Sequence, residues 1–427
     1  MSLNIAIIGG GASGLIAAVS AARTGARVTV FERLPRMGKK LLATGNGRCN
    51  LSNARASADN LWAYHGADIE FAVPALNRFS PCDTVAFFEG LGVLCRVEAQ
   101  GRMYPACGQA SAVLDALRFE CERLGVRVLT DTEVTGIQAA EPGQESDAPR
   151  FLLQMADSRP DTEVFPYADR VIIASGGKSA KEHGSNGSGF VLLEDLGHKI
   201  TLLSPALAPI KTQTDFVRQL RGVRVCAVVT LVNNGKNAEI RHGEILFTEY
   251  GVSGIPAMQL SRYVSKIGCV LVLDLLPDFA LERLLSSAAE LLSHAGDESA
   301  SRLLAGFLGR RLAEAVLKRF GHSPETPAKD IDIPAFFRLA KALPLEVTGT
   351  AGFGASQVTA GGADTSQFNP QTMESRLCKG LYACGEVLDI DGDCGGYNLQ
   401  WAWSSGRLAA QSAADSVDSY IFTTAKI

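Results

Sequence analysis

Three glycines and one acid near the start of this 427-residue sequence have types and a spacing that suit one kind of chemistry. Gly9, Gly11 and Gly14 form a G-x-G-x-x-G pattern, and Glu32 lies 18 residues after the last glycine. The first glycine permits a tight turn, the second lets backbone approach a pyrophosphate, and the third lets a helix pack closely on a strand. We expect Glu32 to accept hydrogen bonds from ribose hydroxyls and to disfavour a 2′-phosphate. The pattern therefore predicts a site for FAD or NAD, not for NADP.

The elements that must position these residues are also readable. The apolar run at 5–8 is typical of a strand buried on both faces of a parallel sheet. Residues 15–25 have the pattern of a helix that ends at Gly25, and RVTVFE at 27–32 suits a second strand. The start of the helix would offer free N–H groups to phosphates. This order predicts an α/β fold of Rossmann type rather than an isolated glycine turn.

Three further stretches favour FAD over NAD. Residues 36–53, RMGKKLLATGNGRCNLSN, are basic and rich in glycine, which suits a loop wrapped around an anionic ligand, although a solvent loop is the alternative. Such an arm is needed for a flavin, which extends past the pyrophosphate, and not for NAD. Residues 169–177, DRVIIASGG, and 380–386, GLYACGE, each end an apolar strand in small residues. Both are typical of the strands that return to the cofactor in flavoproteins with two dinucleotide-binding folds.

The stretch GGYNLQWAWSSG at 395–406 predicts where the flavin ring lies. Gly395 and Gly396 would let backbone approach a flat ring, and a helix that begins near Tyr397 would point its N-terminus at it. That terminus stabilises the negative charge of a reduced flavin. We interpret Trp401 and Trp403 as core packing, with contact to flavin or substrate as the alternative.

Four side chains are candidates for catalysis: Arg48, Cys49, Tyr104 and Tyr397. Arg48 could clamp a carboxylate or polarise a carbonyl, or else hold the flavin. Tyr104 could donate a proton or simply pack, and Cys49 could be a nucleophile or only a small residue beside the flavin. The histidines carry no motif, and His183 lies nearest to a predicted cofactor loop.

The full set of expected cofactor contacts combines these stretches with their flanking positions. We expect FAD to be held by Gly9, Gly11, Ala12, Ser13, Gly14, Glu32, Arg33, Lys40, Gly45, Asn46, Gly47, Arg48, Cys49, Asn50, Val134, Ala174, Ser175, Gly176, Gly385, Glu386, Asp391, Gly395, Gly396, Tyr397, Asn398 and Leu399. None of the ten cysteines forms a C-x-x-C pair, so we expect reduced thiols and no metal site.

The composition is that of a globular protein, with 46% apolar and 20% charged residues. A net charge of −4 disfavours a dedicated nucleic-acid binder and leaves a small molecule as the expected partner. No apolar run is long enough to span a bilayer, and the first residues lack the pattern of a signal peptide. We therefore expect a cytoplasmic location and no membrane partner, and the sequence predicts no oligomeric state.

These motifs together resemble the BaiN-like family of FAD-dependent flavoproteins. The resemblance runs through GGGASGLIAA, GKKLLATGNGRCNLSN, GRMYP, ASGG, FTEYGVSGIPA and GLYACGEVLDIDGDCGGYNLQWAWSSG, and so spans nearly the whole chain. The family includes aminoacetone-oxidase-like members and reductases proposed to act on bile-acid enones. It implies non-covalent FAD, and a discontinuous FAD-binding domain interrupted by a β-barrel and a helical bundle.

The chain itself indicates where such an insert lies. β-rich runs appear at 225–232 and 244–250, and residues 280–320 are dense in Leu, Ala, Glu and Arg at helical spacing. We expect an FAD-binding domain from 1–195 and 346–427 and an insert from 196–345. Within the insert, we expect a β-barrel from about 196–255 and 330–345 and a helical part from about 256–329.

Only one nucleotide-binding pattern is present, and no redox-active dithiol accompanies it. A pyridine-nucleotide–disulfide reductase is therefore excluded. Three hypotheses stay open. The chain could reduce an activated C=C or C=O bond with electrons from transiently bound NAD(P)H, with hydride transfer from flavin N5, and we favour the C=C bond of an enone. It could instead oxidise a small amine and produce hydrogen peroxide, or use the flavin to bind a partner or sense redox state.

Overall fold

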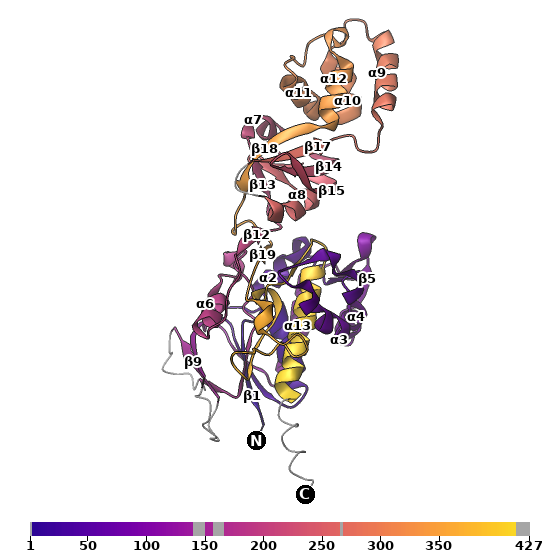
Figure 1. Cartoon of the computed structure of the whole chain (residues 1–427). Coiled ribbons are helices and arrows are strands. Elements are labelled where there is room, and N and C mark those ends of the chain that lie inside the picture. The colour runs from indigo at the N-terminus through magenta and orange to yellow at the C-terminus, as the bar shows by residue number, and fades with distance from the viewer. Residues whose placement is uncertain (1, 140–149, 157–165, 265–267, 416–427) are drawn as a thin grey trace. The chain divides into compact units, whose positions relative to one another are not determined.

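The computed structural model describes residues 2–139, 150–156, 166–264 and 268–415, arranged in two compact units (Figure 1). The first unit comprises Met1–Ser204 and Val358–Ile427, and the second comprises Pro205–Gln357. The second unit begins later than the expected residue 196, because Leu196, Ile200 and Leu203 pack against the core of the first. It ends later than residue 345, because a strand that runs to Thr350 still belongs to the barrel of the second unit.

The first unit is built on a five-stranded sheet in the order β20-β11-β1-β2-β7, and every pairing in it is parallel. Its strands are β1 (Asn4–Ile8), β2 (Arg27–Phe31), β7 (Arg127–Leu129), β11 (Arg170–Ile173) and β20 (Leu381–Ala383). β1 lies between β2 and β11, so apolar residues such as Ile7 are buried from both faces. The predicted α/β fold with a Rossmann-type sheet is confirmed.

Seven α-helices accompany the described strands of this unit. They are α1 (Ala12–Ala22), α2 (Lys39–Ala43), α3 (Val73–Arg78), α4 (Pro81–Glu89), α5 (Ala110–Arg123), α6 (Ser188–Asp195) and α13 (Tyr397–Asp415). α1 and α13 pack closely, because a Cβ on Gly406 of α13 would lie 2.5 Å from the Ser13 carbonyl oxygen. Trp401 and Trp403 are fully buried in α13, and their indole N–H groups donate to the carbonyls of Gly385 and Leu51 at 3.1 and 2.9 Å. Core packing is therefore confirmed for both.

Smaller sheets complete the first unit. β8 (Val134–Ala139), β9 (Phe151–Met155) and β10 (Tyr167–Ala168) form an antiparallel sheet, as do β3 (Ser52–Asn53), β6 (Arg102–Pro105) and β5 (Cys95–Val97). β4 (Tyr64–His65) pairs with β21 (Asp391–Gly392), which directly precedes the start of α13. β12 (Ser204–Ala206) and β19 (Val358–Ala360) lie where the chain leaves and re-enters this unit.

The second unit contains a closed barrel in the order β13-β16-β15-β14-β17-β18. The bounds are β13 (Ile210–Thr212), β14 (Arg224–Asn233), β15 (Lys236–Phe247), β16 (Gly251–Ser253), β17 (Cys269–Asp274) and β18 (Leu343–Thr350). Its helices are α7 (Thr214–Val217), α8 (Ile255–Leu260), α9 (Leu281–Ala295), α10 (Ala300–Leu308), α11 (Arg310–Arg319) and α12 (Ile333–Lys341). In Figure 1, α9 to α12 gather on one side of the barrel, and one apolar core joins them to it.

Two parts of the insert differ from the sequence-based assignment. Residues 256–329 were expected to be helical, but β17 lies among them, because CVLVLD alternates buried and half-buried side chains as a barrel strand does. Residues 330–345 were expected to be barrel, but α12 occupies most of them. Its Ile333, Phe336, Phe337 and Ala340 recur at helical spacing and are buried. Among the described residues, no helix is both long enough and apolar enough to span a membrane.

Replacing Gly14 with alanine should destabilise the protein. A Cβ at this position would lie 1.9 Å from the Gly9 carbonyl oxygen, so backbone would have to move. We expect a loss of about 1–3 kcal/mol in the free energy of unfolding of the apoprotein, measured by urea denaturation. Gly306→Ala in α10 is the control. No atom lies within 4 Å of its Cβ, so alanine there should leave stability unchanged or raise it. Equal losses in both variants would contradict the steric argument.

Candidate active site

The glycine turn between β1 and α1 is closed by backbone contacts that only glycine permits. Gly9 has φ +110°, and a Cβ there would lie 2.5 Å from the Ala174 carbonyl oxygen. Gly11 differs, because no atom lies within 4 Å of the position its Cβ would take. The turn is thus packed on one side at Gly9 and Gly14, and its backbone is open at Gly11. An open backbone at the start of a helix suits the approach of an anionic ligand.

Glu32, at the end of β2, holds this turn in place. Its Oε2 accepts a hydrogen bond from the Gly10 N–H at 2.9 Å, and its Oε1 accepts one from the Leu34 N–H at 2.8 Å. Burial raises the pKa of this carboxyl, and the two backbone hydrogen bonds oppose that shift. Each carboxylate oxygen has a second acceptor site, so Glu32 has capacity left for a ribose.

The strands that return to the turn bring their small residues against it. Ala174 lies beside Gly9 and Gly14, and Gly385 lies beside Ser13, since a Cβ on Gly385 would be 2.7 Å from the Ser13 Oγ. Gly385 follows β20 and donates its N–H to the Ser405 Oγ of α13 at 2.9 Å. The structure therefore joins the glycine turn to residues that are hundreds of positions away in the sequence.

The expected arm at 36–53 folds over the same region. Lys40 donates to Glu386 Oε2 at 2.8 Å, and Glu386 Oε1 accepts from the Thr359 N–H at 2.9 Å. Asn46 and Cys49 have φ of 56° and 59°, a left-handed conformation that is uncommon outside glycine. Such conformations cluster at functional sites, where surrounding structure maintains them.

The arm also meets the start of α13. The Asn53 side-chain amide donates to the Gly395 carbonyl at 2.8 Å, and a Cβ on Gly396 would lie 2.2 Å from the Ser52 carbonyl oxygen. In the orientation that satisfies its neighbours, the Asn50 amide oxygen accepts from the Gly396 N–H at 3.2 Å. Within the β21–α13 segment, Asn398 exchanges hydrogen bonds with both backbone groups of Gly392. The start of α13 is therefore held on two sides.

Arg48 and Tyr104 form a second contact within the arm. The Arg48 guanidinium lies 4.0 Å from the centroid of the Tyr104 ring and donates to Glu98 at 2.5 Å. The hydrogen bond that Arg48 donates to Glu98 raises the pKa of Arg48 and lowers the pKa of Glu98. Tyr104 thus covers one face of the guanidinium, and Glu98 accepts from one of its N–H groups. The remaining N–H groups are available to a ligand.

Cys49, a residue of this arm, is buried. Its side chain has no exposed surface, and burial raises the pKa of the thiol to about 12. The thiolate is the nucleophilic form of cysteine, so this thiol is unreactive near neutral pH. Cys49 therefore behaves as a small packing residue.

Tyr397, the first residue of α13, lies in an aromatic cluster. Its ring meets Tyr64 edge-on at 5.8 Å between centroids and Trp62 at 6.1 Å. Burial raises the pKa of the Tyr397 hydroxyl. Trp62 is 62% exposed, so this cluster reaches the surface of the first unit. An exposed aromatic face beside the start of α13 is suited to contact a flat, apolar ligand.

Other expected cofactor residues have structural partners. The Arg33 Nε donates to the Gly184 carbonyl at 3.0 Å, which ties the end of β2 to the 181–184 turn. Val134 is buried at the start of β8 and follows Thr132, whose N–H donates to the Glu32 carbonyl at 2.9 Å. The remaining positions from the expected set lie within the segments already described, and they are Ala12, Gly45, Gly47, Ser175, Gly176, Asp391 and Leu399.

Sequence reasoning missed one pair of residues. His65 Nε2 lies 2.9 Å from Asp393 Oδ1, and both side chains are largely buried. β4 carries His65 and pairs with β21, two residues ahead of Asp393. The residues are 328 positions apart, and His65 has no local motif. The only available signal was the position of Asp393 inside the DIDGDCGG stretch.

The parallel sheet, the glycine turn and the arm that covers it define an FAD-dependent oxidoreductase on a Rossmann-type fold. The chain belongs to the HI0933-like family, whose model, described as the HI0933-like protein Rossmann domain, matches residues 3–412. Membership of a family that includes BaiN-like reductases is thereby confirmed.

Individual relatives agree with this assignment. The chain is 37% identical over 422 residues to the 3-dehydro-bile acid delta(4,6)-reductase of Clostridium scindens, with 96% of this chain and 99% of that protein covered. It is 30% identical over 411 residues to the ribosomal RNA dihydrouridine synthase of Escherichia coli, with 95% and 96% covered. A 3-ketosteroid delta1-dehydrogenase from Sterolibacterium denitrificans shares the fold, with a TM-score of 0.53, 13% identity, and 97% and 100% of the two chains covered.

Alkylation should separate the cysteines by burial. Iodoacetamide at pH 8 should modify exposed Cys107 and Cys226 and spare Cys49 and Cys384, which are buried and whose pKa values burial raises to about 12. Because these pKa values are raised, reaction at the buried pair should begin only as pH rises well above the ordinary range for a thiol. Peptide mass spectrometry after a timed pulse measures this, and the urea-unfolded chain is the control. Cys49 reacting as fast as Cys107 would contradict the burial.

Proposed function

We propose that this enzyme reduces a C=C bond conjugated to a carbonyl group, with NAD(P)H as the transient electron donor. One observation carries the proposal: the open Gly11 turn, Glu32 and the start of α13 all belong to the first unit. The chain that contains them is 37% identical to a reductase. The arm at 36–53 and the β21–α13 segment would hold the reacting parts together.

The residues of the site fit FAD. Glu32 has acceptor capacity for the adenosine ribose, and the backbone at Gly11 is open to a pyrophosphate at the start of α1. Gly395 and Gly396 precede the start of α13, where a flavin ring would lie, and Gly396 packs against the Ser52 carbonyl, which fixes this backbone. When bound, FAD supplies a carrier that accepts a hydride and delivers it to carbon. We also propose that the 26 residues expected from the sequence to contact FAD do so.

The names of the two relatives support this substrate class. One acts on a 3-dehydro bile acid at its delta(4,6) bonds, and the other makes dihydrouridine in ribosomal RNA. Both names describe saturation of a C=C bond conjugated to a carbonyl. In such a reduction, a hydride adds to the carbon distal to the carbonyl, and a proton adds to the carbon beside it. The protein must therefore polarise the carbonyl and supply one proton.

The chain has groups for both tasks. The free N–H groups of Arg48 can polarise a carbonyl oxygen, and the Tyr104 and Tyr397 hydroxyls are further donors near the same arm. We assign the proton to His65, because its Nε2 is hydrogen-bonded to Asp393 Oδ1, so its Nδ1 is the ring nitrogen that would serve a substrate. Asp393 orients the imidazole through this hydrogen bond. Cys49 has no acid–base role in this scheme because its pKa is about 12.

A second candidate function is reduction of uridine in ribosomal RNA, which the relative from Escherichia coli favours. The net charge of −4 gives the chain no overall attraction for RNA, so the small-molecule substrate is preferred. Amine oxidation with peroxide release and a redox-sensing role are the further alternatives.

The first experiment is an anaerobic titration of the FAD-loaded protein with NADH and then NADPH, followed by steroid enones. We expect bleaching of the oxidised flavin band by one nucleotide and its return on addition of an enone, with loss of the C=C absorbance. A return of the band with ribosomal RNA and not with enones would favour the second candidate. Bleaching by an amine together with peroxide formation in air would overturn the reductase proposal.

Gly11→Ala tests the cofactor site without disturbing the fold. Gly11 has φ −82° and an open Cβ position, so alanine should leave the stability of the apoprotein unchanged. The added methyl group would lie where the pyrophosphate must approach, so FAD affinity should fall about 10- to 100-fold. Fluorescence titration of the apoprotein with FAD measures this. Unchanged FAD affinity would place the cofactor elsewhere.

His65→Gln tests proton delivery. The rate at which substrate is reduced should fall about 10²- to 10⁴-fold, because the donor is lost, while the rate of bleaching by NAD(P)H stays unchanged. Stopped-flow absorbance separates the two half-reactions. His294→Gln is the matched control, since His294 is exposed in the last turn of α9 in the second unit. Equal slowing of both half-reactions by His65→Gln would indicate a structural role only.

A further inference from the structure

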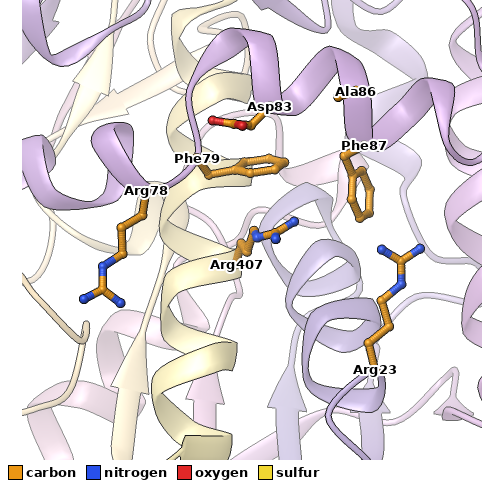
Figure 2. A pocket seen from close by; sticks show the side chains of 7 residues that line it. All are labelled: Arg23, Arg78, Phe79, Asp83, Ala86, Phe87 and Arg407. Carbon is orange, nitrogen blue, oxygen red and sulfur yellow. The ribbon is translucent and has the colours of Figure 1, made fainter.

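A hollow on the first unit, outside the candidate active site, gathers three arginines. It has a volume of about 280 Å³ and is lined by Arg23, Arg78, Phe79, Asp83, Ala86, Phe87 and Arg407 (Figure 2). Ligand pockets for drug-sized molecules occupy roughly 300–1,000 Å³, so this hollow suits a smaller ligand. Three arginines beside one aspartate make it locally basic on a chain with a net charge of −4.

Four elements build this hollow. Arg23 follows the last residue of α1, Arg78 ends α3, Phe87 belongs to α4, and Arg407 projects from α13. The hollow is separate from the glycine turn. Gly11 and Arg23 flank the opposite ends of α1, a helix of 11 residues, so at a rise of 1.5 Å per residue they lie about 18 Å apart. An anion in the hollow would therefore not be the cofactor pyrophosphate.

Aromatic rings cover the faces of two of the guanidinium groups. Arg407 lies 4.7 Å from the centroid of Phe79, and Arg23 lies 5.1 Å from that of Phe87. Figure 2 shows the guanidinium groups of Arg407 and Arg23 on the same side of these two rings. A guanidinium donates from its edges, so a ring on its face fixes its direction and leaves its N–H groups available.

The donors of Arg407 have no partner within the protein. Among the residues that the structure describes, Arg407 makes no hydrogen bond and no ion pair, although it is half-buried. Arg23 is partly engaged, because its Nε and one Nη donate to Glu120 Oε1 at 3.0 and 2.7 Å. Its other Nη makes no hydrogen bond within the described part of the chain. Half-buried charged donors without partners are costly unless a ligand or water satisfies them.

The electrostatics of the hollow also favour an anion. Burial lowers the pKa of Arg407, and the positive charge of Arg23 lowers it further, while Asp83 acts in the opposite direction. Asp83 is engaged elsewhere, since its carboxylate accepts from the Ser80 N–H and hydroxyl at 2.9 and 2.6 Å in a capping box. Asp83 therefore offsets only part of the positive charge, because the lining carries three arginines against this one aspartate.

We propose that this hollow binds the phosphate group of a small anion through the free N–H groups of Arg407 and Arg23, with Arg78 at its rim. A phosphate offers several acceptor oxygens and a charge near −2, which match two guanidinium groups. A lone carboxylate would match only one. The phosphate can come from inorganic phosphate or from a nucleoside monophosphate, in which case Phe79 or Phe87 would lie near the base or sugar.

Calorimetric titration of the FAD-loaded protein tests this proposal, with inorganic phosphate and adenosine monophosphate in separate arms at constant ionic strength. We expect binding in at least one arm. Arg407→Gln should weaken it about 10- to 100-fold, as expected for loss of charged hydrogen bonds. Arg118→Gln on the exposed face of α5 is the control and should bind normally, because Arg118 pairs with Asp115 and does not line the hollow. Asp83→Asn should strengthen binding, since it removes a competing negative charge.

A second variant guards against misfolding. Arg407→Lys keeps the charge and loses the planar fork, so it should give an intermediate affinity with the flavin spectrum unchanged. The proposal is overturned if neither phosphate compound binds to the wild-type protein, or if Arg407→Gln and Arg118→Gln bind equally. Binding of an RNA oligomer without binding of either small phosphate would likewise overturn it. Because FAD is already bound in every arm, these results are independent of the reaction proposed above.

Discussion

The first unit depends on close contacts between backbone segments at glycines, where a Cβ atom would keep the two segments apart. Gly14 lies against the Gly9 carbonyl, and Gly9 lies against the carbonyl of Ala174. These contacts bring the start of α1, the end of β1 and the end of β11 to one point. The same rule recurs where Gly406 of α13 meets Ser13 of α1 and where Gly396 meets Ser52. Each of these glycines allows two segments that are far apart in the sequence to approach more closely than a residue with a side chain would.

Polar contacts then fix the positions of these backbone segments relative to one another. The two carboxylate oxygens of Glu32 accept hydrogen bonds from the backbone N–H groups of Gly10 and Leu34, which follow β1 and β2. Glu386 links the Lys40 ammonium to the Thr359 N–H. The indole of Trp403 satisfies the Leu51 carbonyl inside the core. Buried polar groups of this kind stabilise the fold because each has its partner. At Gly11, by contrast, no atom lies within 4 Å of the position that a Cβ would take.

Much of this was predictable, and for local reasons. The G-x-G-x-x-G turn, the flanking strands and Glu32 lie within 28 residues, so spacing alone predicts their arrangement. The insert was predicted less well. β17 was mistaken for part of a helical region because CVLVLD is a short apolar run between helix-rich segments. α12 was missed although its buried apolar residues recur at helical spacing, because residues 330–345 were expected to return to the barrel.

The sequence by itself determined the Rossmann-type turn, the family and the segments that surround the cofactor, because these depend on residue types at short and regular spacings. Only the tertiary structure decided which distant side chains meet. The β4–β21 pairing brings His65 to Asp393 across 328 positions, and three helices and a helix end bring Arg23, Arg78 and Arg407 to one hollow. Such contacts follow from strand register and helix packing. Their members are single residues without a motif, so no local pattern records them.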